Sequence, residues 1–517
     1  MVWLRKSLIL AHRYLGIILS LMFVMWFITG IGMIYSRGMP RLTPQVRLSR
    51  LPPLNLSEVR LSPSQALEHA NLDRPNGRVT LLTVNERPAY RFGNSGTVFA
   101  DNGELMIEID SSAARKIAAG FMNLPVEQVR PAEDLTEPDQ WTLTQTRQLP
   151  LYKVVVNDAA RTELYVSPGT AEVIQITTRA SRLLSWVSTI PHFLYFAPLR
   201  LKNELWVKTM TWIPGLACVL AGLGIVLGVV QFRRSRPHIR YSGWMRWHYI
   251  SGLVFGVLTL TWAFSGLLSM EPWAWTEKDQ IERGIRQAFA SGAGDLASFP
   301  RIDAPTWTEI LAGHSAKEIE FSRILDEPYY IVRTSPGEKA LVGWPDGGHQ
   351  PYFVSRDPDA ARFVVSAKTI RVNREHLSID VIVKRLRDVK PDISIAETAT
   401  LTKYDSYYYS RDGQAPLPVV RVKLGDADKT WIYVDPEVAQ VVGHVNRLNR
   451  VERWLYNGLH TLDFSFLYYN RPLWDAVVIV LSLGGTAVSS IGLFMGLKRL
   501  RRGIQRTAKS LSTIVNL

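Results

Sequence analysis

Four segments of this chain are long and apolar enough to cross a lipid bilayer, and they constrain its fold more than any other feature. A helix that spans the hydrocarbon core needs about 20 predominantly apolar residues. The four segments are 8–35, 206–232, 247–270 and 473–497. The first is too long for a removable signal peptide, and no small-residue cleavage pattern follows it. The sequence therefore predicts a membrane protein with four transmembrane α-helices.

Charged residues predict the orientation of these helices. No Asp or Glu precedes Glu58 or follows Asp475, and none lies between Glu204 and Glu271. The acid-free flanks of the helices carry 14 cations, which equal the whole formal net charge of +14: Arg5, Lys6, Arg13, Arg233, Arg234, Arg236, Arg240, Arg246, Lys498, Arg499, Arg501, Arg502, Arg506 and Lys509. The positive-inside rule then predicts that both termini and the loop 233–246 are cytoplasmic. Because topology accounts for the basic balance, we expect membrane lipid, and no nucleic acid, as a partner.

These segments divide the chain into alternating membrane and outward parts. The predicted order is a cytoplasmic N-terminus at 1–7, a first span at 8–35, an outward segment at 36–205, a second span at 206–232, a basic cytoplasmic loop at 233–246, a third span at 247–270, an outward segment at 271–472, a fourth span at 473–497 and a basic cytoplasmic tail at 498–517. Aromatic and apolar residues near 181–195 and 451–468 predict interfacial helices before the second and fourth spans. With Cys218 as the single cysteine, disulfides and a cysteine-based metal cluster are excluded.

The outward segments have the pattern of α+β domains. In the first, Ser62 is a candidate N-cap with Pro63 at the first helical position, and a second helix is predicted at 111–122. Strand-like runs occur at 78–84, 89–92, 104–110, 153–156, 163–166 and 172–176, with a hairpin turn at 101–103. Each half of the segment therefore reads as a helix plus an antiparallel sheet.

The chain also repeats itself. A histidine, a glycine four residues on and a Trp-x-x-Ser/Thr-Gly motif begin at His12 and again, in the same spacing, at His248. Further equivalent positions are 268 residues apart: Arg182 and Arg450, Trp186 and Trp454, His192 and His460, and Trp206 and Trp474. The sequence thus predicts two parallel repeats of span, outward domain and span, related by an axis along the membrane normal. In that arrangement His12 and His248 share one depth near the cytoplasmic face, and His192 and His460 share one near the outer face.

These four histidines are the candidate cofactor ligands. Ionisable groups within or beside a span are functional candidates, although a lone histidine at the end of a span is more often an interfacial residue. Zinc requires three or four ligands, whereas haem requires two axial nitrogens, an apolar pocket and room for a flat ring. The pairing therefore favours two bis-histidine haem sites, an inner one with His12 and His248 and an outer one with His192 and His460.

Small and aromatic residues near the histidines have two interpretations. Gly16 and Gly252 lie one helical turn beyond His12 and His248, and we expect them to line a haem pocket. The Thr-Gly and Ser-Gly pairs at 29–30 and 265–266 are explained equally well by close helix packing. The tryptophans 14 positions after His12 and His248 are typical of an interfacial belt.

Three motifs resemble the PepSY-associated transmembrane family: His12-Arg13-Tyr14-Leu15-Gly16, Tyr433-Val434-Asp435-Pro436 and Leu459-His460-Thr461. The resemblance covers nearly the whole chain. It implies a bacterial inner-membrane protein with four spans, two large α+β, PepSY-like periplasmic domains and two b-type haems, whose iron His12, His248, His192 and His460 would bind. The first copy departs from the motifs at Ser167-Pro168 and at Pro191-His192-Phe193, and these departures affect the outer site.

The leading hypothesis is a haem-dependent oxidoreductase that carries electrons from an unknown cytoplasmic-side or membrane donor to a periplasmic ferric complex of the siderophore type. We expect no catalytic acid or base, because electron transfer needs none. The alternative is a non-enzymatic, membrane-anchored PepSY module that binds or regulates a peptide, protease or transporter. A permease is a third interpretation, which the scarcity of polar groups in the spans disfavours.

Overall fold

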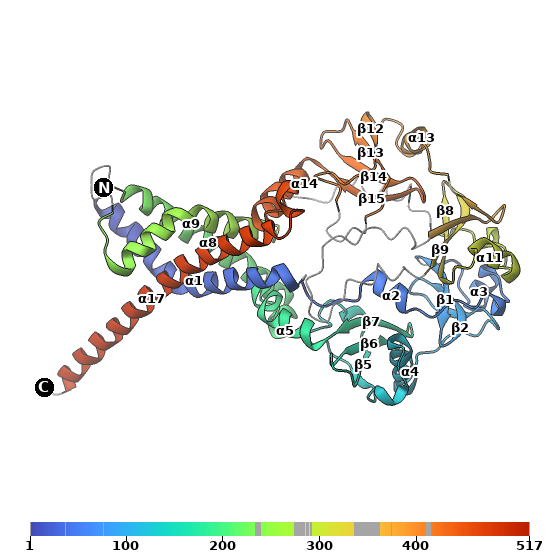
Figure 1. Ribbon diagram of the computed structural model, residues 1–517, viewed down its shortest axis with the longest axis horizontal. Coiled ribbons are helices and arrows are strands. Elements are labelled where there is room, and N and C mark those ends of the chain that lie inside the picture. Colours follow the sequence, from blue (N-terminus) through green and yellow to red (C-terminus); the bar gives the residue numbers. More distant parts are fainter. Residues whose placement is uncertain are drawn as a thin grey trace.

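The computed structural model describes residues 2–515 except 37, 76, 233–238, 273–284, 286–288, 290–291, 335–361, 374 and 410–414. Most of the predicted cytoplasmic loop, including Arg233, Arg234 and Arg236, lies outside the described residues, as do the side chains of Arg506 and Lys509. In Figure 1, four long helices form a bundle at one end of the molecule, and all three sheets lie beyond its other end. Both chain termini lie on the side of the bundle away from the sheets.

The four helices confirm the predicted membrane segments. They are α1 (Val2–Ser36), α8 (Asn203–Val230), α9 (Gly243–Leu268) and α17 (Leu473–Val515). Each contains an apolar stretch long enough to span a bilayer. Helix α17 packs along α1, and α8 packs along α9. Glycine permits the first contact, because a Cβ on Gly485 of α17 would lie 2.4 Å from Cζ of Phe27 on α1.

The largest sheet joins the two outward segments. Its strands, in spatial order, are β11 (Arg371–Asn373), β10 (Arg362–Ser366), β9 (Glu327–Thr334), β8 (Ala316–Ile324), β1 (Val79–Val84), β2 (Arg87–Phe92) and β3 (Thr97–Phe99). All neighbours are antiparallel, and β1 pairs with β8 so that Leu81 lies opposite Ile319. We expected two separate domains. The structure differs because β1 is a central strand, buried along its whole length, and its partner β8 comes from the other segment.

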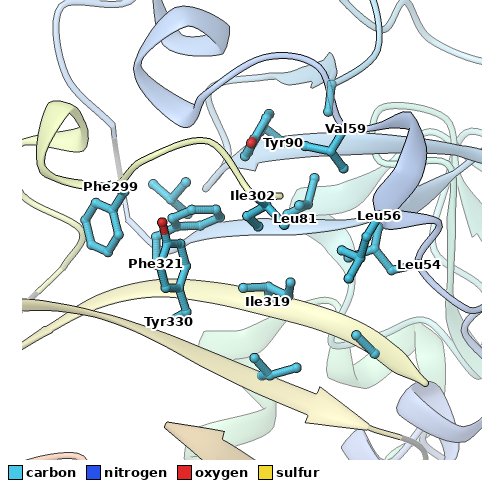
Figure 2. Close-up of a cluster of buried hydrophobic side chains, with 14 of the residues drawn as sticks. Leu54, Leu56, Val59, Leu81, Tyr90, Phe299, Ile302, Ile319, Phe321 and Tyr330 are labelled. Atoms are coloured by element: carbon cyan, nitrogen blue, oxygen red, sulfur yellow. The ribbon is translucent and has the colours of Figure 1, made fainter. Parts of the chain in front are cut away.

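An aromatic core on one face of this sheet fastens the two segments together. Figure 2 shows Leu81 and Tyr90 from the first segment beside Ile319, Phe321 and Tyr330 from the second. The rings of Tyr90 and Phe321 lie 5.7 Å apart, and Tyr90 Oη donates a hydrogen bond to the carbonyl of Leu61. Because aromatic pairs of this kind contribute about 0.5–1.5 kcal/mol beyond area burial, the junction is a specific contact.

Each segment also has a four-stranded antiparallel sheet of its own. The first consists of β4 (Glu133–Leu135), β5 (Leu151–Val155), β6 (Glu163–Ser167) and β7 (Glu172–Thr177). The second consists of β12 (Ile395–Leu401), β13 (Val419–Leu424), β14 (Trp431–Asp435) and β15 (Gln440–Val445). Both sheets have a register shift at equivalent places, between Tyr165 and Val166 and between Tyr433 and Val434.

The remaining helices are short. They are α2 (Pro44–Arg50), α3 (Pro63–His69), α4 (Ser111–Met122), α5 (Arg179–Val187), α6 (Thr189–Phe193), α7 (Ala197–Arg200), α11 (Ala304–Leu311), α13 (Ile379–Val389), α14 (Arg447–Glu452), α15 (Leu459–Thr461) and α16 (Ser465–Tyr468). Ser62 forms the expected cap of α3 in a capping box with Gln65. The predicted strand 104–110 is wrong: after the turn, Leu105 makes a single bridge to Val98, and Asp110 then caps α4.

Buried charges hold the large sheet to the first small sheet. Glu318 on β8, whose side chain is 6% exposed, accepts a hydrogen bond from Arg47 at 2.9 Å and another from Arg333 at 3.1 Å. Arg47 also donates to Glu172 of β7 at 2.8 Å. Burial alone raises the pKa of Glu318, but Arg47 and Arg333 outweigh burial, so its pKa is lower than that of an ordinary glutamate.

We expect Glu318→Gln to destabilise the sheet region by about 3 kcal/mol, because it leaves buried arginines without their countercharge. The lowered pKa means that ionised Glu318 contributes its full stability above about pH 4.3, the ordinary glutamate value, and loses it as the pH falls through the folded-state pKa. The apparent Tm of full-length protein in detergent, measured from pH 3 to pH 7, should therefore fall less steeply at low pH in the variant. Glu397→Gln, which changes a half-exposed carboxylate paired with Lys423, is the matched control and should leave the apparent Tm unchanged. Equal acid sensitivity of Glu318→Gln and the native chain would contradict this assignment.

Candidate cofactor site

The inner histidines lie side by side in the helix bundle. His12 on α1 and His248 on α9 have ring centroids 6.3 Å apart, with the ring planes inclined by 40°. His12 Nδ1 lies 3.1 Å from the carbonyl oxygen of Leu220 on α8, and His248 Nδ1 lies 3.3 Å from that of Val488 on α17. A carbonyl oxygen can only accept, so in both rings Nδ1 carries the proton and the lone pair of the neutral imidazole is on Nε2.

Glycines bring the two carbonyl-bearing helices close to these rings. Gly224 lies one turn after Leu220, and a Cβ there would be 2.9 Å from Cε1 of His12. Gly492 lies one turn after Val488, and a Cβ there would be 3.3 Å from Cε1 of His248. Any side chain at Gly224 would therefore displace the ring or the helix.

The outer histidines are also neighbours, although they come from short helices outside the spans. His192 on α6 and His460 on α15 have ring centroids 6.2 Å apart and ring planes inclined by 75°. Nδ1 of His192 lies 3.0 Å from Oγ1 of Thr29 on α1, and Nδ1 of His460 lies 2.9 Å from Oγ of Ser265 on α9. The two sites therefore have the same plan, in which each Nδ1 is occupied by a partner on a neighbouring helix.

Four tryptophans fix the backbone of the outer histidine segments. Their indole Nε1 atoms donate to main-chain carbonyls at 2.8–3.0 Å: Trp26 to His192, Trp206 to Phe193, Trp262 to Leu459 and Trp474 to Thr461. Trp26 and Trp262, interpreted from sequence as belt residues, thus also position the candidate ligands. Because a buried indole N–H needs an acceptor, these bonds define where each segment lies on the bundle.

The predicted interfacial helices are broken rather than continuous. In 181–195, α5 ends at Val187 and α6 begins after Ser188. Pro191 lies in the first turn of α6, where no intrahelical donor is needed, so it does not disrupt the helix that carries His192. In 451–468, a π-helix at Arg453–Gly458 precedes α15 and His460. The breaks allow both histidines to turn inward against α1 and α9.

The spacing of each pair fits two axial ligands of one metal ion. A metal–imidazole bond is about 2.0–2.1 Å long and the coordinating nitrogen lies about 1 Å from its ring centroid, so axial imidazoles have centroids about 6 Å apart. In the described part of the chain, no hydrogen bond engages Nε2 of any of these four rings. Among the same residues, no three His, Cys, Asp or Glu side chains gather to hold a metal ion without a macrocycle. The residues present therefore fit haem better than zinc.

The glycines predicted from sequence leave space beside the inner pair. A Cβ at Gly252 would meet no atom within 4 Å, and one at Gly16 would meet only side-chain atoms of Leu220 and Ser20 at 3.9 and 4.0 Å. Sequence reasoning missed Gly224 and Gly492, although their offset of 268 was a usable signal. It assigned the hydroxyls at 29 and 265 to packing, whereas they bind the outer histidines.

Comparison with known proteins agrees with the architecture. No curated protein matches the chain. The model of one family, described as the PepSY-associated TM region, matches residues 9–499 and so includes all four long helices and the sheets between them. The chain therefore belongs to the PepSY-associated transmembrane family.

Proposed function

We propose that this protein transfers electrons across the membrane through two b-type haems and reduces a ferric, siderophore-type complex on the sheet side. The observation that carries the proposal is the duplicate geometry of the histidine pairs. Both have the centroid spacing of axial ligands, and in both each Nδ1 is bound so that Nε2 is available to a metal. Bound haem would supply one-electron chemistry at iron.

The two pairs lie at opposite ends of the bundle. His12 and Thr29, which mark the inner and outer levels on α1, are 17 positions apart. At about 1.5 Å per residue this separation is about 25 Å, close to the thickness of the hydrocarbon core. His248 and Ser265 give the same separation on α9. Two sites at these levels would cover most of the distance across a bilayer.

Apolar side chains fill the bundle between the two levels. Phe23 and Phe27 lie between His12 and Thr29 on α1 and are 5% and 4% exposed. The Phe27 ring lies 5.6 Å from the ring of Trp262 on α9. In the proposed function, these residues exclude water and ions from the interior, so that charge moves as electrons alone.

Charge and topology support the proposed direction. The flanking cations favour cytoplasmic termini and hence two parallel repeats in a bacterial inner membrane, with both outward segments in the periplasm. The donor would be a cytoplasmic or membrane-bound one-electron reductant. The ferric complex would bind on the sheet side, where its iron is reduced from Fe(III) to Fe(II).

The test is the visible spectrum of full-length protein purified from cells supplied with haem. We expect the spectrum of low-spin, bis-histidine haem, at two haems per chain, reducible by dithionite. In vesicles, the reduced protein should then be reoxidised by an external ferric complex with formation of Fe(II). A colourless preparation would overturn the proposal and would favour the non-enzymatic PepSY module.

A further inference from the structure

We infer that the two histidine pairs have different redox potentials, the outer one more positive, and that Thr29 and Ser265 are the positioning residues that set the outer value. This inference rests on the proposed function, since it concerns the iron those pairs would bind. It follows from a difference in the partners of Nδ1. The inner rings donate to peptide carbonyls, and the outer rings donate to hydroxyls.

The direction of the outer hydrogen bonds is settled by the other contacts of the hydroxyls. Thr29 Oγ1 donates its own proton to the carbonyl of Met25 at 2.7 Å. Ser265 Oγ donates its proton to the carbonyl of Trp262 at 3.1 Å. Each hydroxyl has one proton, so toward His192 and His460 it can act only as an acceptor. The outer rings are therefore the same Nδ1–H tautomer as the inner rings.

The two acceptors differ in strength. A peptide carbonyl belongs to a dipole of about 3.5 D and is a stronger acceptor than an alcohol oxygen. The stronger the acceptor at Nδ1, the more basic the imidazole becomes at Nε2 and the more it stabilises the ferric state of a bound iron. The inner pair, on Leu220 and Val488, should therefore have the lower potential, which makes transfer from the inner to the outer level downhill.

The two acceptors also differ in what a mutation can change. The inner acceptors are main-chain atoms of helices, which no substitution removes. The outer acceptors are side chains, and a valine at Thr29 has nearly the same shape without the oxygen. The outer site is thus the one whose potential side-chain chemistry can adjust.

The experiment is a spectroelectrochemical titration of full-length protein in a His12→Ala background, where only the outer haem remains to be observed. The native chain, titrated beside it, gives the inner value by difference. Thr29→Val and Ser265→Ala should each shift the outer potential to a more positive value, because the ring loses its acceptor and becomes less basic. Thr29→Ser keeps the hydroxyl and should restore the potential. Thr259→Val is the matched control, because Thr259 is a buried hydroxyl on α9 that donates only to Phe255.

Each outcome bears on the inference. Positive shifts in Thr29→Val and Ser265→Ala, with no shift in Thr29→Ser or Thr259→Val, support it. Loss of the outer haem from Thr29→Val but not from Thr29→Ser also supports positioning by the hydroxyl. Unchanged potentials at full haem content, or an inner potential above the outer one, overturn it. A native protein without haem would instead refute the proposed function itself.

Discussion

Removal of the His12 imidazole is expected to halve the haem content of the protein, from two per chain to one. His12 lies inside the bundle, where its Nδ1 donates to Leu220 and its ring lies 6.3 Å from that of His248. Alanine suits the interior of α1, so His12→Ala deletes the ligand without breaking the helix. With one axial nitrogen left, the inner site loses its low-spin haem while the outer site keeps His192 and His460.

The functional consequence should be much larger than a factor of two. A chain with only an outer haem has no group at the inner level, about 25 Å away along α1, to receive an electron from the donor. We expect dithionite-independent, donor-driven reduction of an external ferric complex in vesicles to fall at least about 100-fold. The purified variant should still be reduced directly by dithionite.

The repeat provides a second test and the chain provides a control. His248→Ala should match His12→Ala, because both remove one axial ligand of the same inner site. His376→Ala changes an exposed histidine of the second outward segment and should retain two haems. Full haem content in both inner variants would show that the inner pair does not hold haem, even if the protein is red.

The pairing of the histidines could be predicted because it depends on the repeat. Equivalent residues of parallel repeats lie at equal depth, so the offset from His12 to His248 and from His192 to His460 was sufficient to expect two pairs. The four spans were predictable for a similar reason, since length and hydropathy are local properties of the sequence.

The partners of the histidines could not be predicted in the same way. Leu220 and Val488 act through main-chain carbonyls, and such an interaction leaves no mark on residue type. Thr29 and Ser265 do carry the functional atom in their side chains. Small hydroxyl residues in spans serve helix packing as well, and only the proximity of His192 and His460 distinguishes the two roles.

The shared sheet was missed because pairing between distant strands is a tertiary event. The run Val79–Val84 reads equally well as a strand in a domain of its own. What decides its partner is the available edge of β8, which lies more than 200 residues away in sequence. The junction ties the two outward segments, and through them the two halves of the bundle, into one structure.

Insertion of one methyl group at Gly224 should damage the inner site almost as much as loss of its ligand. A Cβ there would lie 2.9 Å from Cε1 and 3.5 Å from Nδ1 of His12, closer than carbon atoms can approach. Helix α8 is packed along α9 and cannot yield easily, so the ring must move and its bond to Leu220 must lengthen. We expect Gly224→Ala to weaken haem binding at the inner site by about 10- to 100-fold and to leave the outer haem in place.

The glycines of the chain make this prediction graded. A Cβ at Gly492 would lie 3.3 Å from Cε1 of His248, so Gly492→Ala should have a smaller effect of the same kind. A Cβ at Gly222, two residues before Gly224 on the same helix, would meet no atom within 4 Å. Gly222→Ala should therefore keep both haems and should stabilise α8 slightly, because alanine is the better helix former. The measurement is haem content and the midpoint of haem loss on heating for the three variants. An equal effect of Gly224→Ala and Gly222→Ala would mean that His12 does not depend on the close approach of α8, and the geometry assigned to the inner site would be wrong.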